Sequence, residues 1–179
     1  MIELETSRLK LRPVSENDLD RVRAIGSDLR VMASLGGILS DDECRVWLER
    51  QLAHWRTHGY GRFRVDVGAR FAGFVGLSRS DFDRGFVSGI EVAWRLAFEQ
   101  WGNGYATEAA RVVIEHGFAA LGLNEVIGVT HVGNLRSRRV MDRLGMQHAP
   151  GETFEHPSVP AGHPLRMHVV YRLCAPPLR

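Results

Sequence analysis

The chain of 179 residues has only two cysteines, Cys44 and Cys174, and a single lysine, Lys10. The cysteines are far apart, and neither a C-x-x-C pair nor histidines at ligand spacing accompany them. This pattern argues against a disulfide framework and against a zinc site. We therefore expect a protein of a reducing compartment that carries no metal.

Long apolar runs are also missing. No stretch reaches the roughly 18 apolar residues of a membrane span, and the opening MIELETSRLKLRP carries charges where a signal peptide needs an apolar core. The net charge is only +2, and the aromatic residues are not interleaved with basic ones. These features predict a cytoplasmic protein that binds neither membranes nor nucleic acid.

The chain contains no repeat and no low-complexity linker, so its length suits a single domain over residues 1–179. Apolar alternation predicts six strands, at Arg8–Pro13, Phe63–Val67, Phe71–Leu77, Ile90–Leu96, Glu125–Thr130 and Val169–Leu173. Capping signals and helical periodicity predict four helices, at Ser15–Gly26, Ser40–Gly59, Ala106–Leu121 and Asn134–Leu144, and leave Ser27–Leu39 and Asp81–Gly89 as loops. With so few crossover helices, we expect the α+β class, with a mixed and largely antiparallel sheet flanked by helices.

Two glycines, Gly102 and Gly104, separate the fourth strand from a helix. The start of a helix has unpaired N–H groups and the positive end of the helix dipole, so residues Gly102 to Thr107 are a candidate cradle for a pyrophosphate. A plain turn between strand and helix explains the same glycines. No lysine follows Gly104, which excludes a P-loop, and the residues after it do not complete the dinucleotide pattern G-x-G-x-x-G.

Two motifs resemble a known family. They are WGNGYATEA from Trp101 and the N-x-x-S-x-x-x-M-x-x-L-G-M pattern from Asn134 to Met146. Both resemble the GNAT superfamily of acyl-CoA-dependent N-acyltransferases, in its RimJ/RimL-like branch, and so do TSRLKLRP, VMASL, FAGFVGLS and HVVYRL, in the same order along the chain. The resemblance implies acetyl-CoA as co-substrate and a GNAT-like sheet whose splayed strand pair holds acyl-CoA.

The resemblance also assigns residues to the cofactor. Backbone groups of Trp94, Arg95 and Leu96 are expected to bind the pantetheine, and the amides of Gly102, Asn103, Gly104, Tyr105, Ala106 and Thr107 the pyrophosphate. Trp101 departs from the Gln or Arg that the family usually has there, which leaves the backbone donors intact. Asn134 resembles a pantetheine contact, and its residue type equally fits a simple helix cap.

Acyl transfer needs a base for the amine and a proton for the departing thiolate. The tyrosine that many family members use as the acid is replaced by Met141, and Ser137 is the substitute that RimL-like members suggest. Ser137 as a cofactor contact is an equal alternative. Glu91, between Ile90 and Val92, is a candidate base, against the alternative of a solvent-facing or ion-paired strand residue.

Other titratable residues supply further options. Four histidines are candidate bases by type, although a surface or structural role suits each of them: His131, His156, His163 and His168. Four arginines form a solvated helix face, of which one is a candidate for the 3′-phosphate of CoA: Arg136, Arg138, Arg139 and Arg143.

We therefore expect an N-acetyltransferase that transfers the acetyl group directly from acetyl-CoA to a primary amine. The scarcity of strong candidate bases favours a peptide or protein N-terminal α-amine, which is already partly neutral at pH 7. The alternatives are a small-molecule amine, such as an antibiotic or a polyamine, and a module that binds acyl-CoA without catalysis. The sequence leaves both a monomer and a homodimer open.

Overall fold

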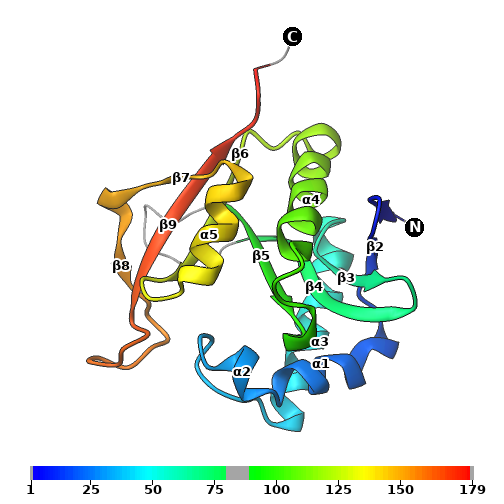
Figure 1. Cartoon of the computed structure of the whole chain (residues 1–179), viewed down its shortest axis with the longest axis horizontal. Helices are drawn as coiled ribbons and strands as arrows, with labels where there is room; N and C mark the ends of the chain where they lie inside the picture. The colour runs from blue at the N-terminus through cyan, green and yellow to red at the C-terminus, as the bar shows by residue number, and fades with distance from the viewer. Residues whose placement is uncertain (1, 80–88, 178–179) are drawn as a thin grey trace.

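The structure is a computed structural model that describes residues 2–79 and 89–177. Its strands form one nine-stranded sheet within this part of the chain, in the order β1-β2-β3-β4-β5-β6-β9-β7, with β8 also paired to β9 (Figure 1). The strands are β1 Leu4–Glu5, β2 Lys10–Pro13, β3 Arg62–Val67, β4 Arg70–Arg79, β5 Ile90–Leu96, β6 Glu125–His131, β7 Gln147–His148, β8 Phe154–Glu155 and β9 Met167–Cys174. β5 and β6 are parallel, whereas the other neighbours are antiparallel, so the predicted sheet type is confirmed.

Helices cover both faces of this sheet. They are α1 Leu19–Gly26, α2 Leu29–Met32, α3 Asp41–His58, α4 Tyr105–Leu121 and α5 Leu135–Leu144, with 3₁₀ turns at Glu16–Asp18, Phe98–Gln100 and Pro150–Glu152. In Figure 1, α4 and α5 lie in front of the sheet and α3 lies behind it. Small or branched side chains of α4 (Ala109, Ala110, Val113) pack on Val92 of β5, whereas α1 and α3 pack around Phe74 of β4. No helix within residues 2–79 and 89–177 is long and apolar enough to cross a membrane.

The helix ends follow the predicted caps. Ser40 and Glu43 form the expected capping box, in which Glu43 accepts from the Ser40 backbone N–H at 2.7 Å. Asn134 caps α5, and α4 ends at Gly122 in the left-handed conformation, as predicted. These boundaries are local in origin, because each depends on one or two side chains next to the helix.

Other elements differ from the prediction. The expected loop Ser27–Leu39 contains α2, a helix of four residues capped by Asp28, which is too short to show a periodic pattern. The strands β1, β7 and β8 have two residues each and were missed for the same reason. Of the expected loop Asp81–Gly89, residues 81–88 lie outside the described part of the chain.

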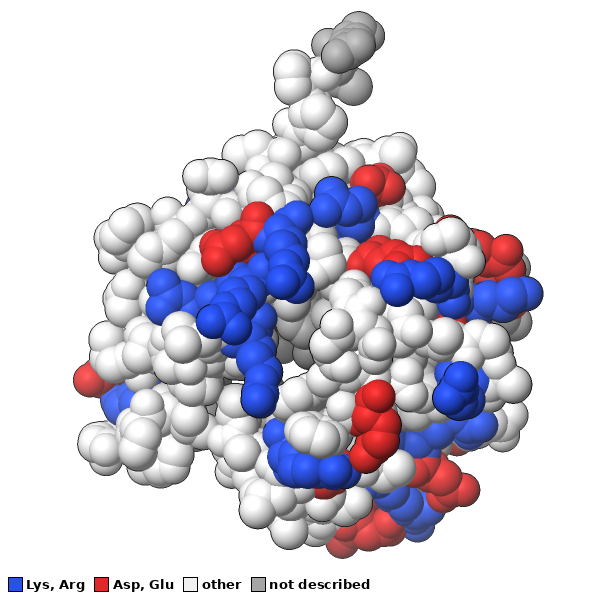
Figure 2. All heavy atoms as spheres, viewed as in Figure 1, with Lys and Arg blue, Asp and Glu red and all other residues white. Residues whose placement is uncertain are grey.

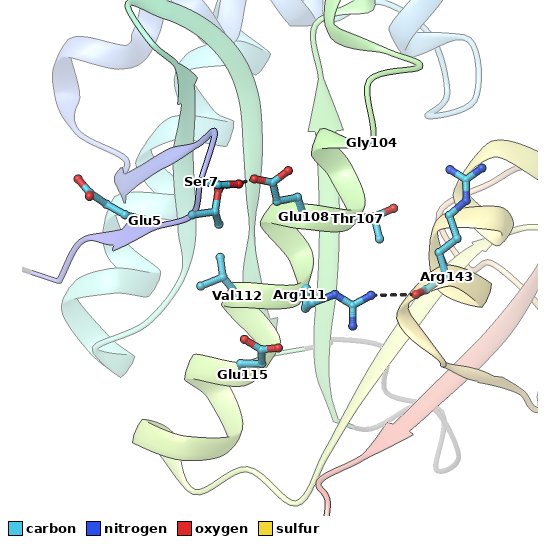
Figure 3. A pocket seen from close by; sticks show the side chains of 10 residues that line it. Glu5, Ser7, Gly104, Thr107, Glu108, Arg111, Val112, Glu115 and Arg143 are labelled. Carbon is cyan, nitrogen blue, oxygen red and sulfur yellow. Dashed lines mark hydrogen bonds between the residues drawn. The ribbon is translucent and has the colours of Figure 1, made fainter.

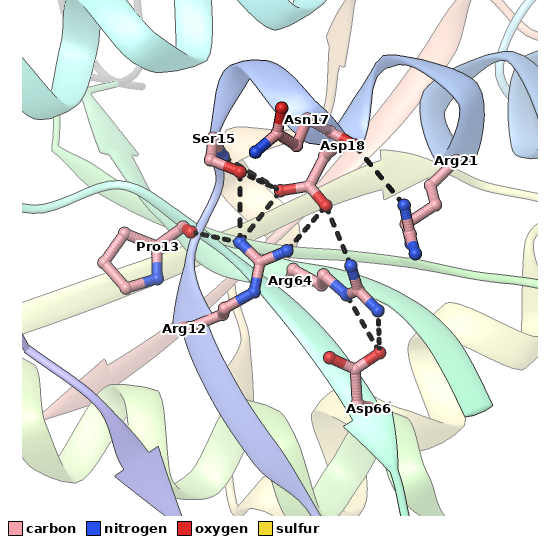
Figure 4. Close-up of polar contacts among 8 residues, drawn as sticks. All are labelled: Arg12, Pro13, Ser15, Asn17, Asp18, Arg21, Arg64 and Asp66. Atoms are coloured by element: carbon pink, nitrogen blue, oxygen red, sulfur yellow. Dashed lines mark hydrogen bonds and ion pairs between the residues drawn. The ribbon is translucent and has the colours of Figure 1, made fainter. Parts of the chain in front are cut away.

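A buried carboxylate fastens α1 to the sheet (Figure 4). Asp18 has no exposed surface and accepts from Arg12 at 2.8 and 3.0 Å and from Arg64 at 3.1 Å. It also accepts from the backbone N–H and hydroxyl of Ser15. Burial acts to raise the pKa of Asp18, but these hydrogen bonds outweigh it and hold the pKa below its usual value. The network therefore fixes the entry to α1 relative to β2 and β3.

The two parallel strands part from each other. The register of β5 and β6 contains a single pair, Glu91 with Ile127, whereas β4 and β5 pair over seven residues from Gly73 to Arg79. Beyond Glu91 the strand β5 therefore has no paired neighbour on its β6 side among the described residues. The predicted splayed strand pair is present, and it opens toward the glycine loop that follows β5.

Candidate active site

The glycine loop leads directly into an uncapped helix. Gly102 and Gly104 both have a φ of +80°, a left-handed conformation in which residues with a side chain are strained. Gly104 has no side chain with which to cap α4, and no capping hydrogen bond is made there within the described residues. The first-turn amides of Tyr105, Ala106 and Thr107 have no acceptor inside the helix. They are available to an anion.

An arginine from the N-terminal segment holds this loop in place. Arg8 donates from Nε to Glu108 in the first turn of α4 at 2.7 Å and from Nη1 to the carbonyl of Asn103 at 3.1 Å. Its guanidinium also lies 4.8 Å from the ring centroid of Tyr105. Thr6 donates to the same Glu108 carboxylate at 2.5 Å. These bonds tie the glycine loop and the start of α4 to the segment that precedes β2.

A buried hydroxyl at the start of α4 has no partner. Thr107 Oγ1 is inaccessible to solvent, and no hydrogen bond to it is made within the described residues. A buried polar atom without a partner costs about 1–3 kcal/mol, so such atoms point to a missing ligand or water. Thr107 lies beside the free amides of the first turn, and a rotation of its side chain would bring this hydroxyl to a phosphate oxygen bound there. The residues of the loop therefore suit the pyrophosphate of acetyl-CoA.

The backbone of β5 presents alternate residues to the gap. The amide of Ala97 donates to the carbonyl of Ala72, so by the alternation of an antiparallel ladder Arg95 bonds to Phe74 of β4. The backbone groups of Trp94 and Leu96 then point toward the β6 side. The Leu96 carbonyl is already used, since it accepts from Trp101 Nε1 at 3.0 Å.

Arg95 therefore differs from its two neighbours on β5. Its backbone is paired with Phe74 and not turned to the gap, so the expected contact between the Arg95 backbone and the cofactor gains no support from this register and stays a prediction. The side chain of Arg95 is the part of this residue that is available to a ligand.

A small polar network stands across the gap on α5. Asn134 Oδ1 accepts from the backbone N–H of Ser137 at 3.2 Å, which fixes the orientation of the amide because that N–H can only donate. Asn134 Nδ2 donates to Thr130 Oγ1 at 3.0 Å and to Ser137 Oγ at 3.1 Å. Since the Ser137 oxygen accepts this bond, its own proton remains available to donate. The cap role of Asn134 is confirmed, and a ligand contact stays a prediction.

One cavity of about 650 Å³ joins most of the predicted residues. Ten of the twelve line it: Trp94, Arg95, Leu96, Gly102, Gly104, Tyr105, Ala106, Thr107, Asn134 and Ser137. It continues past the parted strands to α2 and the residues after it, including Val31, Ala33 and Ser34. Asn103 and Glu91 are not among the lining residues. Asn103 instead shapes the loop, through side-chain bonds to the carbonyls of Gln100 and Trp101.

Glu91 lies at the closed end of the strand pair, opposite Ile127. Burial raises the pKa of its carboxyl, and the nearby charge of Arg62 partly opposes the shift. Arg62 itself donates to the carbonyls of Gly76 and Ala93 and to the hydroxyl of Ser78. Glu91 therefore has the raised pKa expected of a base, but it does not line the cavity.

A histidine group lies nearer to the cavity. His131 lines it, and His168 is the cross-strand partner of His131, with ring centroids 6.4 Å apart. His156 packs on His168 at 4.7 Å. Burial lowers the pKa of all three below the usual value, so each is neutral at pH 7. His163 is exposed, and its ring Nδ1 accepts from the backbone N–H of Leu165.

Positive side chains gather over α5, beside the hollow at the centre of the face shown in Figure 2. Arg136 lies 4.8 Å from the ring centroid of Trp101, and Arg139 and Arg143 line the same cavity. Arg138 instead donates to Tyr171 and to the carbonyl of Val132. Three of the four predicted arginines are therefore placed to meet phosphates.

A second cavity, of about 580 Å³, opens on the other side of α4 (Figure 3). It shares Gly104, Thr107 and Arg143 with the first, and it also contains Glu108. Arg111 donates to the carbonyl of Arg143 across this cavity at 3.0 Å. The contact joins α4 to α5.

Sequence reasoning missed three contributions. The pairing of Arg8 with Glu108 joins residues 100 positions apart, and no pattern in the sequence predicted it. Trp101 was treated as a neutral departure, yet its indole ties the glycine loop to the end of β5. Met141 is buried against Gly128, so its side chain belongs to the core and does not face the cavity.

A glycine loop that feeds an uncapped helix is an anion site, and its place next to a parted pair of parallel strands is the arrangement that the family resemblance implies for an acyl-CoA-dependent transferase. Comparison with known sequences agrees. Residues 8–147 match the family described as the Acetyltransferase (GNAT) domain. The chain belongs to this GNAT acetyltransferase family, and it is an acetyl-CoA-dependent acyltransferase.

Individual relatives support the same class. FsC-acetyl coenzyme A-N(2)-transacetylase of Aspergillus fumigatus is 31% identical over 159 residues, which cover 84% of this chain and 66% of that protein. The crystal structure of an acetyltransferase from Agrobacterium tumefaciens has a TM-score of 0.79 at 25% identity and covers 98% of this chain and 95% of its own. The structure of RimL, a ribosomal L7/L12 alpha-N-protein acetyltransferase in complex with coenzyme A, has a TM-score of 0.76 at 14% identity. The match covers 94% of this chain and 95% of the RimL chain. At that identity the likeness to RimL concerns the fold.

Proposed function

We propose that this chain transfers the acetyl group of acetyl-CoA directly to the α-amine of a peptide or protein, as a RimJ/RimL-like member of its family. The observation that carries the proposal is the cavity, which runs from the glycine loop, past the open edge of β5, to the residues around α2. A linear cofactor at one end and an amine at the other can meet beside β5. Direct transfer needs only such a meeting point and no covalent enzyme intermediate.

The proposed cofactor site divides into two parts. The amides of Gly102 to Thr107 and the Thr107 hydroxyl would bind the pyrophosphate, assisted by the arginines of α5. The outward backbone groups of Trp94 and the N–H of Leu96 would bind the pantetheine in the manner of an added strand. Asn103 acts indirectly in this proposal, by shaping the loop.

Ser137 would serve as the acid. Acetyl-CoA supplies a thioester, whose thiolate has a conjugate acid of pKa about 8.5 and therefore needs only modest protonation. The Ser137 hydroxyl lines the cavity with its proton free to donate, because its oxygen already accepts from Asn134. Asn134 would thus orient the acid.

Two groups compete for the role of base. Glu91 keeps its candidacy through its raised pKa, and it would act through water because it does not line the cavity. His131 lines the cavity and is neutral at pH 7. Neither is a strong base, which suits an α-amine of pKa about 7.7–8.0 better than a lysine-like amine near about 10.4. This match supports the α-amine over a more basic acceptor.

The test is a CoA-release assay on peptides whose N-termini are free or blocked. The proposal predicts turnover with free α-amines, an acetylated N-terminus by mass spectrometry, and no release once the terminus is blocked. Turnover confined to small amines, such as polyamines or aminoglycosides, would contradict the α-amine assignment while leaving the acetyltransferase intact. Saturable binding of acetyl-CoA without any turnover would contradict the proposal as a whole.

A further inference from the structure

The large cavity has an unusual balance of charge. Among the described residues that line it are five arginines and neither an aspartate nor a glutamate: Arg30, Arg95, Arg136, Arg139 and Arg143. Desolvated positive charge without counter-charge is unfavourable, so such a cavity is built for anionic ligands. The question is which ligand group each arginine serves.

Four of the five arginines are accounted for. Three belong to α5, where the phosphates of the cofactor would satisfy them. Arg30 has carboxylate partners of its own, Asp28 and Glu99 at 2.6 and 2.8 Å, and its guanidinium also lies over the ring of Phe98. Only Arg95 is left without an explanation.

Arg95 points away from the cofactor helix. Along β5 the side chains of Val92 and Leu96 pack toward α4, so the alternation of the strand directs Arg95 to the opposite face. There its guanidinium carbon lies 5.7 Å from the ring centroid of Trp47 on α3. This is the face of α1 and α3, where the residues that follow α2 also line the cavity.

No carboxylate neutralises Arg95 within the described part of the chain. Burial lowers the pKa of Arg95, and the positive charge of Arg62 lowers it further, to about 10. The guanidinium therefore stays charged at pH 7 but is poorly solvated. An anion that binds beside an arginine in this state stabilises its charge.

We propose that Arg95 binds a carboxylate of the acceptor, so that the preferred substrate is an amine that also carries an acidic group. The proposal rests on the proposed acetyltransferase function and narrows its substrate class. The ring of Trp47 would hold the planar guanidinium in one orientation, ready for the two parallel hydrogen bonds that a carboxylate accepts. The same charge balance works against polyamines, because no described carboxylate lines the cavity to receive their ammonium groups.

The test uses two matched pairs of probes, measured by calorimetry in the presence of saturating CoA. A tripeptide amide that begins with glutamate is compared with one that begins with glutamine, and alanine is compared with alaninamide. We expect the acid member of at least one pair to bind about tenfold or more tightly than its amide, as a charge-assisted bidentate contact implies. Arg95→Gln should abolish this preference, and Arg95→Lys should retain only part of it, because lysine keeps the charge without the planar fork.

Arg45→Gln is the matched control. Arg45 lies exposed on α3, pairs with Asp41 and does not line the cavity. Its substitution removes the same single charge, so the preference for the acid over the amide should persist. The fold is checked by thermal unfolding. Ligand-free Arg95→Gln should melt at or above the wild-type temperature because it removes a poorly solvated charge, whereas an arginine with a purely structural role would lower the temperature when lost.

Equal affinity for acid and amide in both pairs would overturn the proposal, as would a preference that survives Arg95→Gln. Failure of all four probes to bind would also count against it. Each of these outcomes is distinct from failure of the proposed function, since CoA release with neutral free peptides would continue if only the carboxylate site were wrong.

Discussion

The guanidinium of Arg8 holds the carboxylate of Glu108, a residue 100 positions further along the chain, and joins the segment before β2 to the first turn of α4. The same guanidinium donates to the carbonyl of Asn103 in the glycine loop. The glycine loop, which we propose binds the pyrophosphate, is thus shaped by a side chain that does not line the large cavity. Preorganisation of this kind lowers the cost of ordering a loop when ligand binds.

Arg8→Gln should therefore weaken acetyl-CoA binding more than it weakens the fold. We expect the Kd to rise about fivefold, which corresponds to about 1 kcal/mol, and the free energy of unfolding to fall by less than about 1 kcal/mol because the pair is partly exposed. Calorimetry and urea unfolding measure the two effects. Lys10→Gln, which breaks only an exposed pair with Glu5, should change neither. An unchanged Kd in Arg8→Gln would show that the loop needs no brace.

The buried network at Asp18 governs stability. Asp18→Asn should lower the free energy of unfolding by about 3 kcal/mol, since it leaves Arg12 and Arg64 without their shared carboxylate. Asp20→Asn, at an exposed site with one surface pair, should cost less than about 1 kcal/mol. Similar losses in the two variants, measured by urea unfolding, would contradict a special role for Asp18.

The Asp18 network also has a pH signature. The folded pKa of Asp18 lies below its unfolded value of about 3.9, so its contribution is complete above that pH and is lost as pH falls through the folded pKa. Asp18→Asn should remove this part of the acid-induced loss of stability. Unfolding curves collected between neutral pH and about pH 2 would show it as a shallower decline than in the wild type.

Ser137 is tested by separating its two possible roles. Ser137→Ala keeps the backbone N–H that Asn134 caps, so α5 should remain intact. If the hydroxyl is the acid, kcat should fall about tenfold or more while the KM for acetyl-CoA stays within about twofold. A KM that rises at constant kcat would make Ser137 a cofactor contact instead.

The base is tested through pH profiles of the two candidates. The pKa of Glu91 is raised above the usual glutamate value and that of His131 is lowered below the usual histidine value, so both would produce a loss of kcat/KM on the acidic side. The wild-type profile alone therefore cannot distinguish them. Glu91→Gln and His131→Gln should differ, because only the variant that lacks the base loses the acidic limb. An acidic limb retained by both variants would exclude both residues.

The sequence predicted features that depend on neighbouring residues. Asn134 as the cap of α5, Gly122 as the end of α4 and the parted strands after Glu91 are all present. Each follows from local patterns or, for the strands, from the family resemblance. The site residues were assigned mainly by the resemblance, and ten of the twelve line one cavity.

The sequence did not predict features that depend on which face a side chain occupies or on distant partners. The apolar neighbours Ile90 and Val92 made Glu91 a candidate base, whereas its place opposite Ile127 puts it at the closed end of the strand pair. The role of Arg95 depended on a hydrogen-bonding alternation that only the register with Phe74 reveals. The bond from Arg8 to Glu108 required the fold itself.

The central claim is that the backbone of residues Gly102 to Thr107 binds acetyl-CoA. Its most direct test is the affinity for acetyl-CoA, by calorimetry, of Gly104→Val and Gly122→Val. Both glycines are left-handed at an end of α4, with φ of +80° and +65°, so a branched side chain strains the backbone at either position, but only Gly104 lines the cavity. We predict that Gly104→Val weakens binding by well over about tenfold, or about 1.4 kcal/mol, and that Gly122→Val loses comparable stability but binds as the wild type does. Wild-type affinity in a folded Gly104→Val protein would contradict the account.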